Sequence, residues 1–160
     1  MFDLQRNETG VSDYVLLAAQ LESLLATERD FIANAAQFAA LLFNEMPGLN
    51  WAGFYFNRDE QLLLGPFQGR VACVRIDFDR GVCGAAATTR QTQRVADVHA
   101  VDGHIACDSA SNSELVVPLE KNGRLLGVLD LDSPQLGRFS AEDQRGVEAL
   151  VAIFLRLTDC

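Results

Sequence analysis

The sequence predicts an α+β fold with helices packed on a central antiparallel sheet, and two observations lead to this prediction. Apolar residues follow helical spacing near both ends of the chain, as in YVLLAAQLESLLA and QRGVEALVAIFLRL. The middle of the chain instead holds short aromatic or branched runs between turn residues, which is typical of strands. The order of elements, with helices grouped apart from most strands, is that of an α+β domain.

Three helices of ordinary length are expected. The first runs over about residues 12–26 with Ser12 as its N-cap, and the second over about residues 30–45, stopping before Pro47. The third begins near Ser140, where SAED has the form of a capping box with acidic residues in the first turn.

Strands are expected in five runs: WAGFYF (51–56), QLLLGPF (61–67), ACVRIDF (72–78), ELVVPLE (114–120) and RLLGVLDLDS (124–133). The last two flank Lys-Asn-Gly, a signal for a tight hairpin. A short helix is expected over residues 81–91. The segment 90–113 has little predicted structure, and we expect it to be a functional loop because it carries His99, His104 and Cys107.

Length and composition bound the class of protein. The 160 residues suffice for one domain, expected over residues 1–160 with residues 1–10 as a flexible N-terminal segment. A formal net charge of −9 argues against binding DNA or RNA, which requires a basic surface. No apolar stretch reaches membrane-spanning length and the N-terminus does not resemble a secretory signal, so a cytoplasmic location is expected.

Four cysteines, Cys73, Cys83, Cys107 and Cys160, are then expected to be reduced in the resting cell. Their wide spacing, without a C-x-x-C or H-x-x-H pair, argues against a metal, and no metal ligand is expected. The sequence also has no G-x-S-x-G motif and no phosphate-loop spacing, which argues against a serine hydrolase and a nucleotide-phosphate site.

Cysteine redox chemistry is the option that is left. Cys83 lies between two glycines at the start of a predicted helix, where backbone N–H groups favour a thiolate. Cys73 lies on a predicted strand and Cys107 in the long loop, so the three could meet as a nucleophile and a resolving partner. Equally, Cys73 and Cys83 could fill the core and Cys107 could be incidental. Cys160, near the chain end, is expected to be a spectator.

Acidic and aromatic residues form a second group of candidates. Asp130 and Asp132 alternate onto one face of a predicted strand. With Glu114 nearby they would concentrate negative charge, which suits an ammonium group or a proton donor with a raised pKa. The alternative is a solvated sheet edge. Trp51 and Tyr55 also share a face and could wall an apolar subsite or simply belong to the core.

Motifs spread over about residues 50–139 resemble those of one family. NWAGFY, LLLGPFQG, ACVRI, GVCG, DVHAVDGHIACDSASNSELVVPL and LGVLDLDSP are similar to successive motifs of the free methionine-(R)-sulfoxide reductases, which are built on a GAF domain. The resemblance implies a GAF fold and an oxidoreductase that reduces the R epimer of free methionine sulfoxide. It also implies no bound cofactor, with thioredoxin as the external reductant.

The resemblance implies roles for the cysteines. Cys107 matches the nucleophile, which becomes a sulfenic acid, and a second cysteine then condenses with it to a disulfide. Both Cys73 and Cys83 match partner positions; Cys73 is favoured, with Cys83 as an auxiliary. The order of these two, and the primacy of Cys107 over Cys83 as nucleophile, stay open.

The resemblance also implies roles for the acids and aromatics. Glu114 and Asp132 match the acids near the sulfoxide oxygen, and Asp130 would help to hold the substrate ammonium. Trp51 and Tyr55 match the wall that receives the terminal methyl group. The substrate carboxylate is expected to meet backbone N–H groups in the loop before the nucleophile.

Other classes of function stay open at this point. A GAF domain could bind a small ligand without turnover, or act as a thiol-based redox sensor. A symmetric homodimer that pairs through helices is a further expectation. One departure from the family concerns Asp77 and Asp79, whose charge is expected to raise the pKa of Cys83. No role is assigned to His99 or His104.

Overall fold

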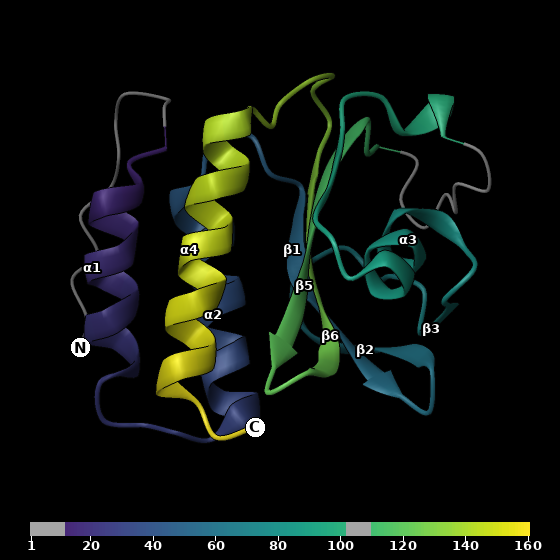
Figure 1. Ribbon diagram of the computed structural model, residues 1–160. Coiled ribbons are helices and arrows are strands. Elements are labelled where there is room, and N and C mark those ends of the chain that lie inside the picture. Colours follow the sequence, from purple (N-terminus) through teal and green to yellow (C-terminus); the bar gives the residue numbers. More distant parts are fainter. Residues whose placement is uncertain (1–11, 102–109) are drawn as a thin grey trace.

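The computed structural model describes residues 12–101 and 110–160 (Figure 1). The segment 1–10, which was expected to be flexible, lies outside these residues, as do His104 and Cys107.

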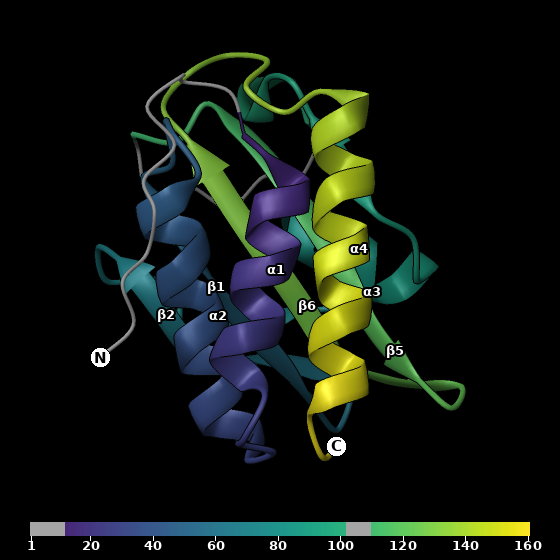
Figure 2. The ribbon, with the colours of Figure 1, turned by 90° about the vertical axis from the view of Figure 1, so that its left-hand side faces the viewer.

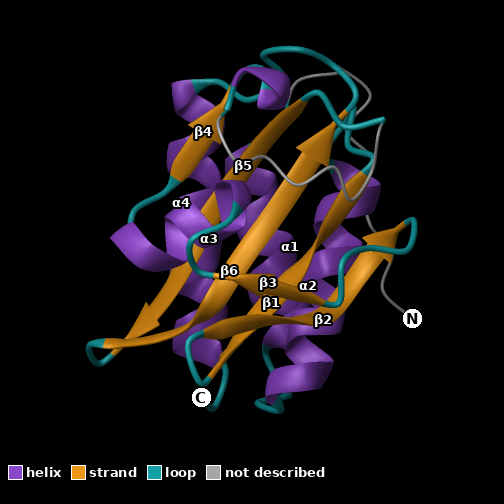
Figure 3. Cartoon of the chain, turned by 90° about the vertical axis from the view of Figure 1, so that its right-hand side faces the viewer, coloured by secondary structure: helices purple, strands orange, loops and turns teal. Residues whose placement is uncertain are grey.

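In the described part of the chain, an antiparallel sheet has helices packed on both of its faces. Its strands are β1 (Trp51–Arg58), β2 (Gln61–Gly69), β3 (Arg75–Asp77), β4 (Gln93–Val95), β5 (Ser113–Lys121) and β6 (Arg124–Ser133), in the spatial order β3-β2-β1-β6-β5-β4. The helices are α1 (Tyr14–Leu25), α2 (Phe31–Glu45), α3 (Gly81–Thr89) and α4 (Ala141–Leu157), with a 3₁₀ turn η1 (Val98–Ala100). Figure 2 shows α1, α2 and α4 covering one face, and Figure 3 shows α3 over the other. The α+β prediction is confirmed.

Alternation along the strands sends side chains into two separate cores. On β1, Phe54 and Phe56 belong to the core beneath α1, α2 and α4, where the ring centroid of Phe54 lies 5.4 Å from that of Phe154. Trp51 and Tyr55 point to the opposite face and belong to the core beneath α3. A side chain on this second face is therefore covered by one helix and its connecting segments.

The helix ends follow their capping residues. α1 begins one residue later than expected because Asp13, not Ser12, is its N-cap: the Asp13 Oδ1 accepts a hydrogen bond from the Leu16 N–H at 3.1 Å. The capping box predicted at Ser140 is confirmed, since its side chain and that of Asp143 each accept from the other's backbone N–H. No helix within the described residues combines the length and apolar character needed to cross a bilayer.

One predicted strand is much shorter than expected. Only Arg75–Asp77 of the run ACVRIDF forms a strand, and Cys73 lies outside it. The carbonyl of Arg70 accepts a hydrogen bond from Nε1 of Trp51 at 3.1 Å, and the carbonyl of Cys73 accepts one from the Tyr55 hydroxyl at 2.9 Å. The Cys73 carbonyl is thus bonded to a side chain and not to a neighbouring strand, so the placement of Cys73 on a strand was wrong.

In its described residues, 90–101 and 110–113, the segment 90–113 is more ordered than its composition indicated. It contains β4, which pairs with β5 through Gln93 and Val116, and the turn η1. β4 is an edge strand of three residues, too short for alternation to show in the sequence. The hairpin between β5 and β6 is confirmed: Asn122 and Gly123 have φ angles of 55° and 76°, as a tight type I′ turn requires.

Candidate active site

Three neighbouring strands bring the predicted acids onto one face of the sheet. Asp132 of β6 pairs with Trp51 of β1 on one side and with Glu114 of β5 on the other. Asp130 lies two residues earlier on β6 and so faces the same side, opposite Gly53 of β1. The register therefore produces the acidic cluster that alternation predicted.

A pocket lies between this face and α3. Predicted site residues from four elements line it together: Trp51, Tyr55, Cys83, Glu114, Asp130 and Asp132. The start of α3 contributes Cys83, and the segment between β2 and β3 closes the pocket with Val71 and Ala72. Residues predicted from separate motifs thus share one pocket.

An aromatic wall forms one side of the pocket. The Trp51 ring stacks on Tyr55 and on Phe67, with centroid distances of 5.8 Å and 5.2 Å. A Cβ at position 53 would overlap Phe67 and would lie 2.8 Å from Cη2 of Trp51. Gly53 is therefore the residue that lets the indole lie flat across β1. The wall is apolar, which suits a methyl or methylene group of a ligand.

The thiol of Cys83 is buried against the acids. Its Sγ donates to Oε1 of Glu114 at 3.8 Å. Burial, followed by the charges of Asp130, Glu114 and Asp132, raises the pKa of Cys83 well above 9.0. The expectation that the helix start would favour a thiolate was wrong, because three carboxylates and the loss of water outweigh the N–H groups of α3.

Asp130 is the least exposed of the three pocket acids. Its side chain is buried, with 5% of the residue exposed, so the alternative of a solvated sheet edge was wrong for this acid. Burial first, then the charges of Asp132 and Glu114, raise its pKa well above 3.8. Its Oδ1 has no hydrogen-bond partner among the described residues.

Tyr55 links the pocket to Cys73. Burial, and then the charge of Asp130, raise the pKa of Tyr55, so its hydroxyl stays protonated and donates to the Cys73 carbonyl. Cys73 is disulfide-bonded, whereas Cys83 and Cys160 are free thiols. Cys160 is exposed and contacts Lys121, at the end of β5 away from Glu114.

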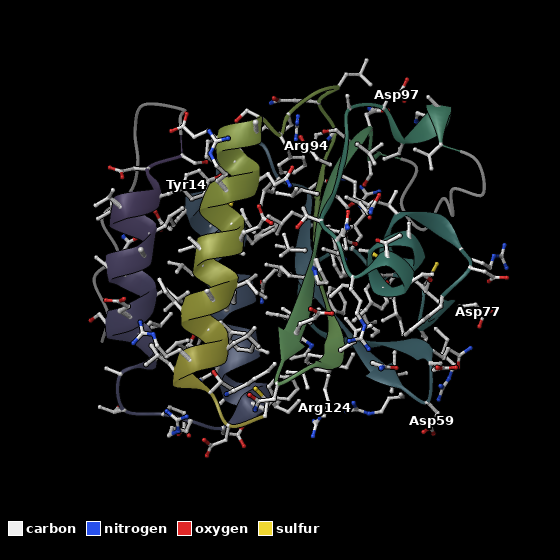
Figure 4. The ribbon with its side chains drawn as sticks, in the orientation of Figure 1. Tyr14, Asp59, Asp77, Arg94, Asp97 and Arg124 are labelled. Atoms are coloured by element: carbon white, nitrogen blue, oxygen red, sulfur yellow. The ribbon has the colours of Figure 1, made fainter. Side chains whose placement is uncertain are left out.

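Asp77 and His99, two residues considered in the sequence analysis, are not among the residues that line the pocket. Asp77 lies on the outer side of the molecule and accepts a hydrogen bond from β2 (Figure 4). The pKa of Cys83 is raised as predicted, but by burial and the pocket acids rather than by Asp77 and Asp79. His99 lies in η1, where its Nε2 lies 3.0 Å from Oδ1 of Asn112.

Sequence reasoning missed three residues of the site. Arg80 lines the pocket at the N-cap of α3, and Ser111 lines it while accepting a hydrogen bond from Nδ2 of Asn50 at 3.2 Å. Phe67 extends the wall behind Trp51. The available signals were positional: Arg80 directly precedes GVCG, Ser111 follows the predicted nucleophile by four residues, and Phe67 lies two residues before the end of β2.

Known proteins with similar sequences and structures agree with this architecture. The family model for the GAF domain matches residues 26–154. The free methionine-R-sulfoxide reductase of Escherichia coli is 52% identical over 139 residues, covering 87% of this chain and 84% of the relative. The enzyme of that name from Saccharomyces cerevisiae is 39% identical, covering 92% and 85%.

Solved structures extend the likeness to the fold. The free methionine-R-sulfoxide reductase of Neisseria meningitidis, solved in complex with its substrate, has a TM-score of 0.91 and 42% identity, covering 98% of this chain and 95% of that chain. The reduced form of the Staphylococcus aureus protein has a TM-score of 0.90 and 46% identity, covering 92% and 96%. On sequence, fold and coverage, this chain belongs to the free methionine-R-sulfoxide reductase family of GAF-domain proteins.

Proposed function

We propose that this protein reduces free L-methionine-(R)-sulfoxide to methionine. The observation that carries the proposal is the pocket itself, which Trp51 and Tyr55 line together with three carboxylates, while the Tyr55 hydroxyl donates to the carbonyl of the disulfide-bonded Cys73. A small zwitterion with one apolar end matches that division into an apolar wall and an acidic floor. The substrate-bound relative from Neisseria meningitidis shares the fold closely.

In the proposed binding mode, each part of the substrate meets a suitable group. The terminal methyl group packs on Trp51 and Tyr55, and the ammonium group donates to Asp130, whose Oδ1 is otherwise without a partner. The sulfoxide oxygen lies near Glu114 and Asp132, where a protonated carboxyl group lowers the barrier to S–O cleavage. The substrate carboxylate meets backbone N–H groups in the loop before the nucleophile, outside the described residues.

The proposed reaction uses two thiols. The Cys107 thiolate attacks the sulfoxide sulfur, the S–O bond breaks, and oxygen passes to Cys107 as a sulfenic acid while the substrate sulfur gains two electrons. The thiol of Cys73 then attacks the sulfenic sulfur and expels water, which leaves a Cys73–Cys107 disulfide. One sulfoxide and two thiols thus become methionine, one disulfide and one water.

The states of the cysteines support this division of roles. Cys73 is disulfide-bonded while Cys83 is a free thiol. The raised pKa of Cys83 makes a thiolate unfavourable there, which disfavours Cys83 as the primary nucleophile. We therefore assign Cys83 an auxiliary role, as a thiol that can exchange with the disulfide after the first turnover.

We propose thioredoxin as the external reductant, in the cytoplasm. Its dithiol would attack the disulfide, take over the bond and return both cysteines as thiols. Val71 and Val74 flank Cys73 and are 88% and 61% exposed, which offers an apolar surface for a partner protein beside the disulfide. We also propose a homodimer that pairs through the outer helices, where Val15 of α1 and Ile32 of α2 are exposed.

The test is methionine release from racemic free methionine sulfoxide with dithiothreitol. Release should stop near half conversion, since one epimer is used, and should vanish in Cys107→Ser but not in the matched Cys160→Ser variant. Full activity in Cys107→Ser would keep the reductase and transfer the nucleophilic role to Cys83. No release from reduced native protein would reject the reductase, and tight methionine binding without turnover would then identify a ligand-binding module.

A further inference from the structure

We propose that Cys83, Glu114 and Asp130 form a binding site for a divalent cation of the zinc type. The site would act as an inhibitory metal site and takes no part in the proposed reaction. The three residues come from α3, β5 and β6, and each is buried.

The donor atoms have the spacing of a small coordination site. One ligand atom from each of the three residues lies within 4.8 Å of the others. The Sγ of Cys83 lies 3.8 Å from Oε1 of Glu114. Tetrahedral zinc with ordinary Zn–S and Zn–O bonds places such atoms about 3.6 Å apart. Binding would therefore need movements of a few tenths of an ångström for this pair.

The charge of the cluster favours a cation. Three carboxylates line the pocket against one cationic side chain, Arg80, and Asp130, with 5% of the residue exposed, leaves Oδ1 without a hydrogen-bond partner among the described residues. A buried acceptor without a partner destabilises the folded state. Binding of a proton, an ammonium group or a metal ion at that atom would offset this cost. Burial raises the pKa of both Asp130 and Cys83, so each releases its proton less readily than in water.

The ligand set indicates which cation would bind. A thiolate sulfur with two carboxylate oxygens suits zinc, cobalt or cadmium, whereas magnesium and calcium prefer oxygen ligands in larger number. Three protein ligands leave a fourth position open toward the pocket. Binding would release the Cys83 proton and any proton held between the carboxyl groups, so affinity should rise with pH.

This site would compete with the substrate. A metal ion at Asp130 occupies the position that we assign to the substrate ammonium, so micromolar zinc should inhibit turnover. This consequence rests on the proposed function; the metal site itself does not.

The experiment is a cobalt titration of the full-length protein, prepared with Cys73 in its disulfide, followed by absorption spectroscopy. Cobalt bound to a thiolate gives a near-ultraviolet charge-transfer band, and zinc should then bleach it by displacement. The native protein and Cys160→Ser should both show the band, and Cys83→Ser should lose it. Asp130→Asn and Glu114→Gln, which keep side-chain shape, should each weaken cobalt binding about tenfold or more.

The outcomes separate this site from the proposed reaction. The band is read without turnover, so its absence in native protein would overturn the metal site and leave the reductase proposal intact. A band that persists in Cys83→Ser, or that disappears in Cys160→Ser, would also overturn it. Circular dichroism of each variant establishes that a lost band reflects a lost ligand and not an unfolded chain.

Discussion

At the scale of single residues, the protonation of Asp130 links the stability of the fold to the chemistry of the pocket. The acid has an ordinary pKa near 3.8 and a raised one in the folded protein. Between these two values the native state binds more protons than the unfolded state, so stability falls as pH rises through the raised pKa. The ionised form of Asp130 therefore destabilises the folded protein.

Asp130→Asn should remove this dependence, because an amide can donate to Glu114 without an ionisable proton. We expect the variant to gain about 1 kcal/mol or more in free energy of unfolding at pH 8, and little at pH 4, relative to the native protein. Urea denaturation at both pH values measures this. Asp59→Asn, at an exposed acid in the turn between β1 and β2, is the control and should leave the pH dependence unchanged. An equal gain at both pH values would contradict the assignment.

Gly53 controls the aromatic wall. In Gly53→Ala the new methyl group would lie 2.8 Å from Cη2 of Trp51 and would overlap Phe67, so the indole must move. We expect a loss of about 1–3 kcal/mol in stability and an increase of about tenfold in KM for free methionine sulfoxide. Steady-state kinetics beside a thermal melt would check both. An unchanged KM would show that the wall does not receive the substrate.

At the scale of elements, the crossing of α1 and α4 depends on one close approach. A Cβ at Gly146 of α4 would overlap the ring of Tyr14, whose hydroxyl donates to Asp143 Oδ1 at 2.6 Å and is thereby fixed (Figure 4). Alanine would gain about 1 kcal/mol in helix propensity. The overlap should cost more than that gain.

We therefore expect Gly146→Ala to lower the free energy of unfolding by about 1–2 kcal/mol net. Its kcat at a temperature below the melting transition should not change, because α1 and α4 lie on the face of the sheet away from the pocket. Tyr14→Ala should restore room for the methyl group, so the double variant should lose less than the sum of the two single variants. Strict additivity would reject the overlap as the cause.

The segment between β2 and β3 is the element that a reductant would contact. Val74→Asp should raise KM for thioredoxin about tenfold, because a charge replaces an exposed apolar contact beside Cys73. Turnover with dithiothreitol should not change. Asn122→Asp, in the exposed hairpin turn between β5 and β6, is the matched control: it adds the same negative charge on a different segment and should affect neither assay. If both variants weakened thioredoxin equally, net charge and not this segment would be responsible.

At the scale of the whole molecule, the two faces of the sheet respond to pH in opposite directions. Burial raises the pKa of Asp143, but hydrogen bonds from Tyr14 and Ser140 and the charge of Arg138 lower it below 3.8 overall. Asp143 therefore contributes stability above that pH, which is lost as pH falls through its lowered pKa. The loss of stability at low pH, here called the acid limb, thus comes from Asp143 on the helical face. The loss of stability at higher pH comes from Asp130 on the pocket face.

We expect a stability maximum in the mildly acidic range, measured as the free energy of unfolding in urea from about pH 3 to pH 9. Tyr14→Phe removes one hydrogen bond to Asp143 and should flatten the acid limb without altering the other. A variant that flattened both limbs equally would show that the two faces are coupled.

Sequence patterns alone determined much of this protein. Helical spacing located α1, α2 and α4, strand alternation placed Asp130 and Asp132 on one face, and the motifs around Trp51, Cys83 and Glu114 indicated the family. These features could be predicted because each depends on residues close together in the chain. Caps, hairpin turns and alternation are local properties of the backbone.

Only the tertiary structure decided the state of the site. Burial beneath α3 reversed the expected ionisation of Cys83, and Cys73 lies outside β3 with its carbonyl bonded to the Tyr55 hydroxyl. The same packing brought Cys83 to Asp130, although 46 residues separate them in the sequence. The physical reason is that pKa values, close contacts and ligand clusters depend on desolvation and on groups brought together from distant parts of the chain, which no local pattern encodes.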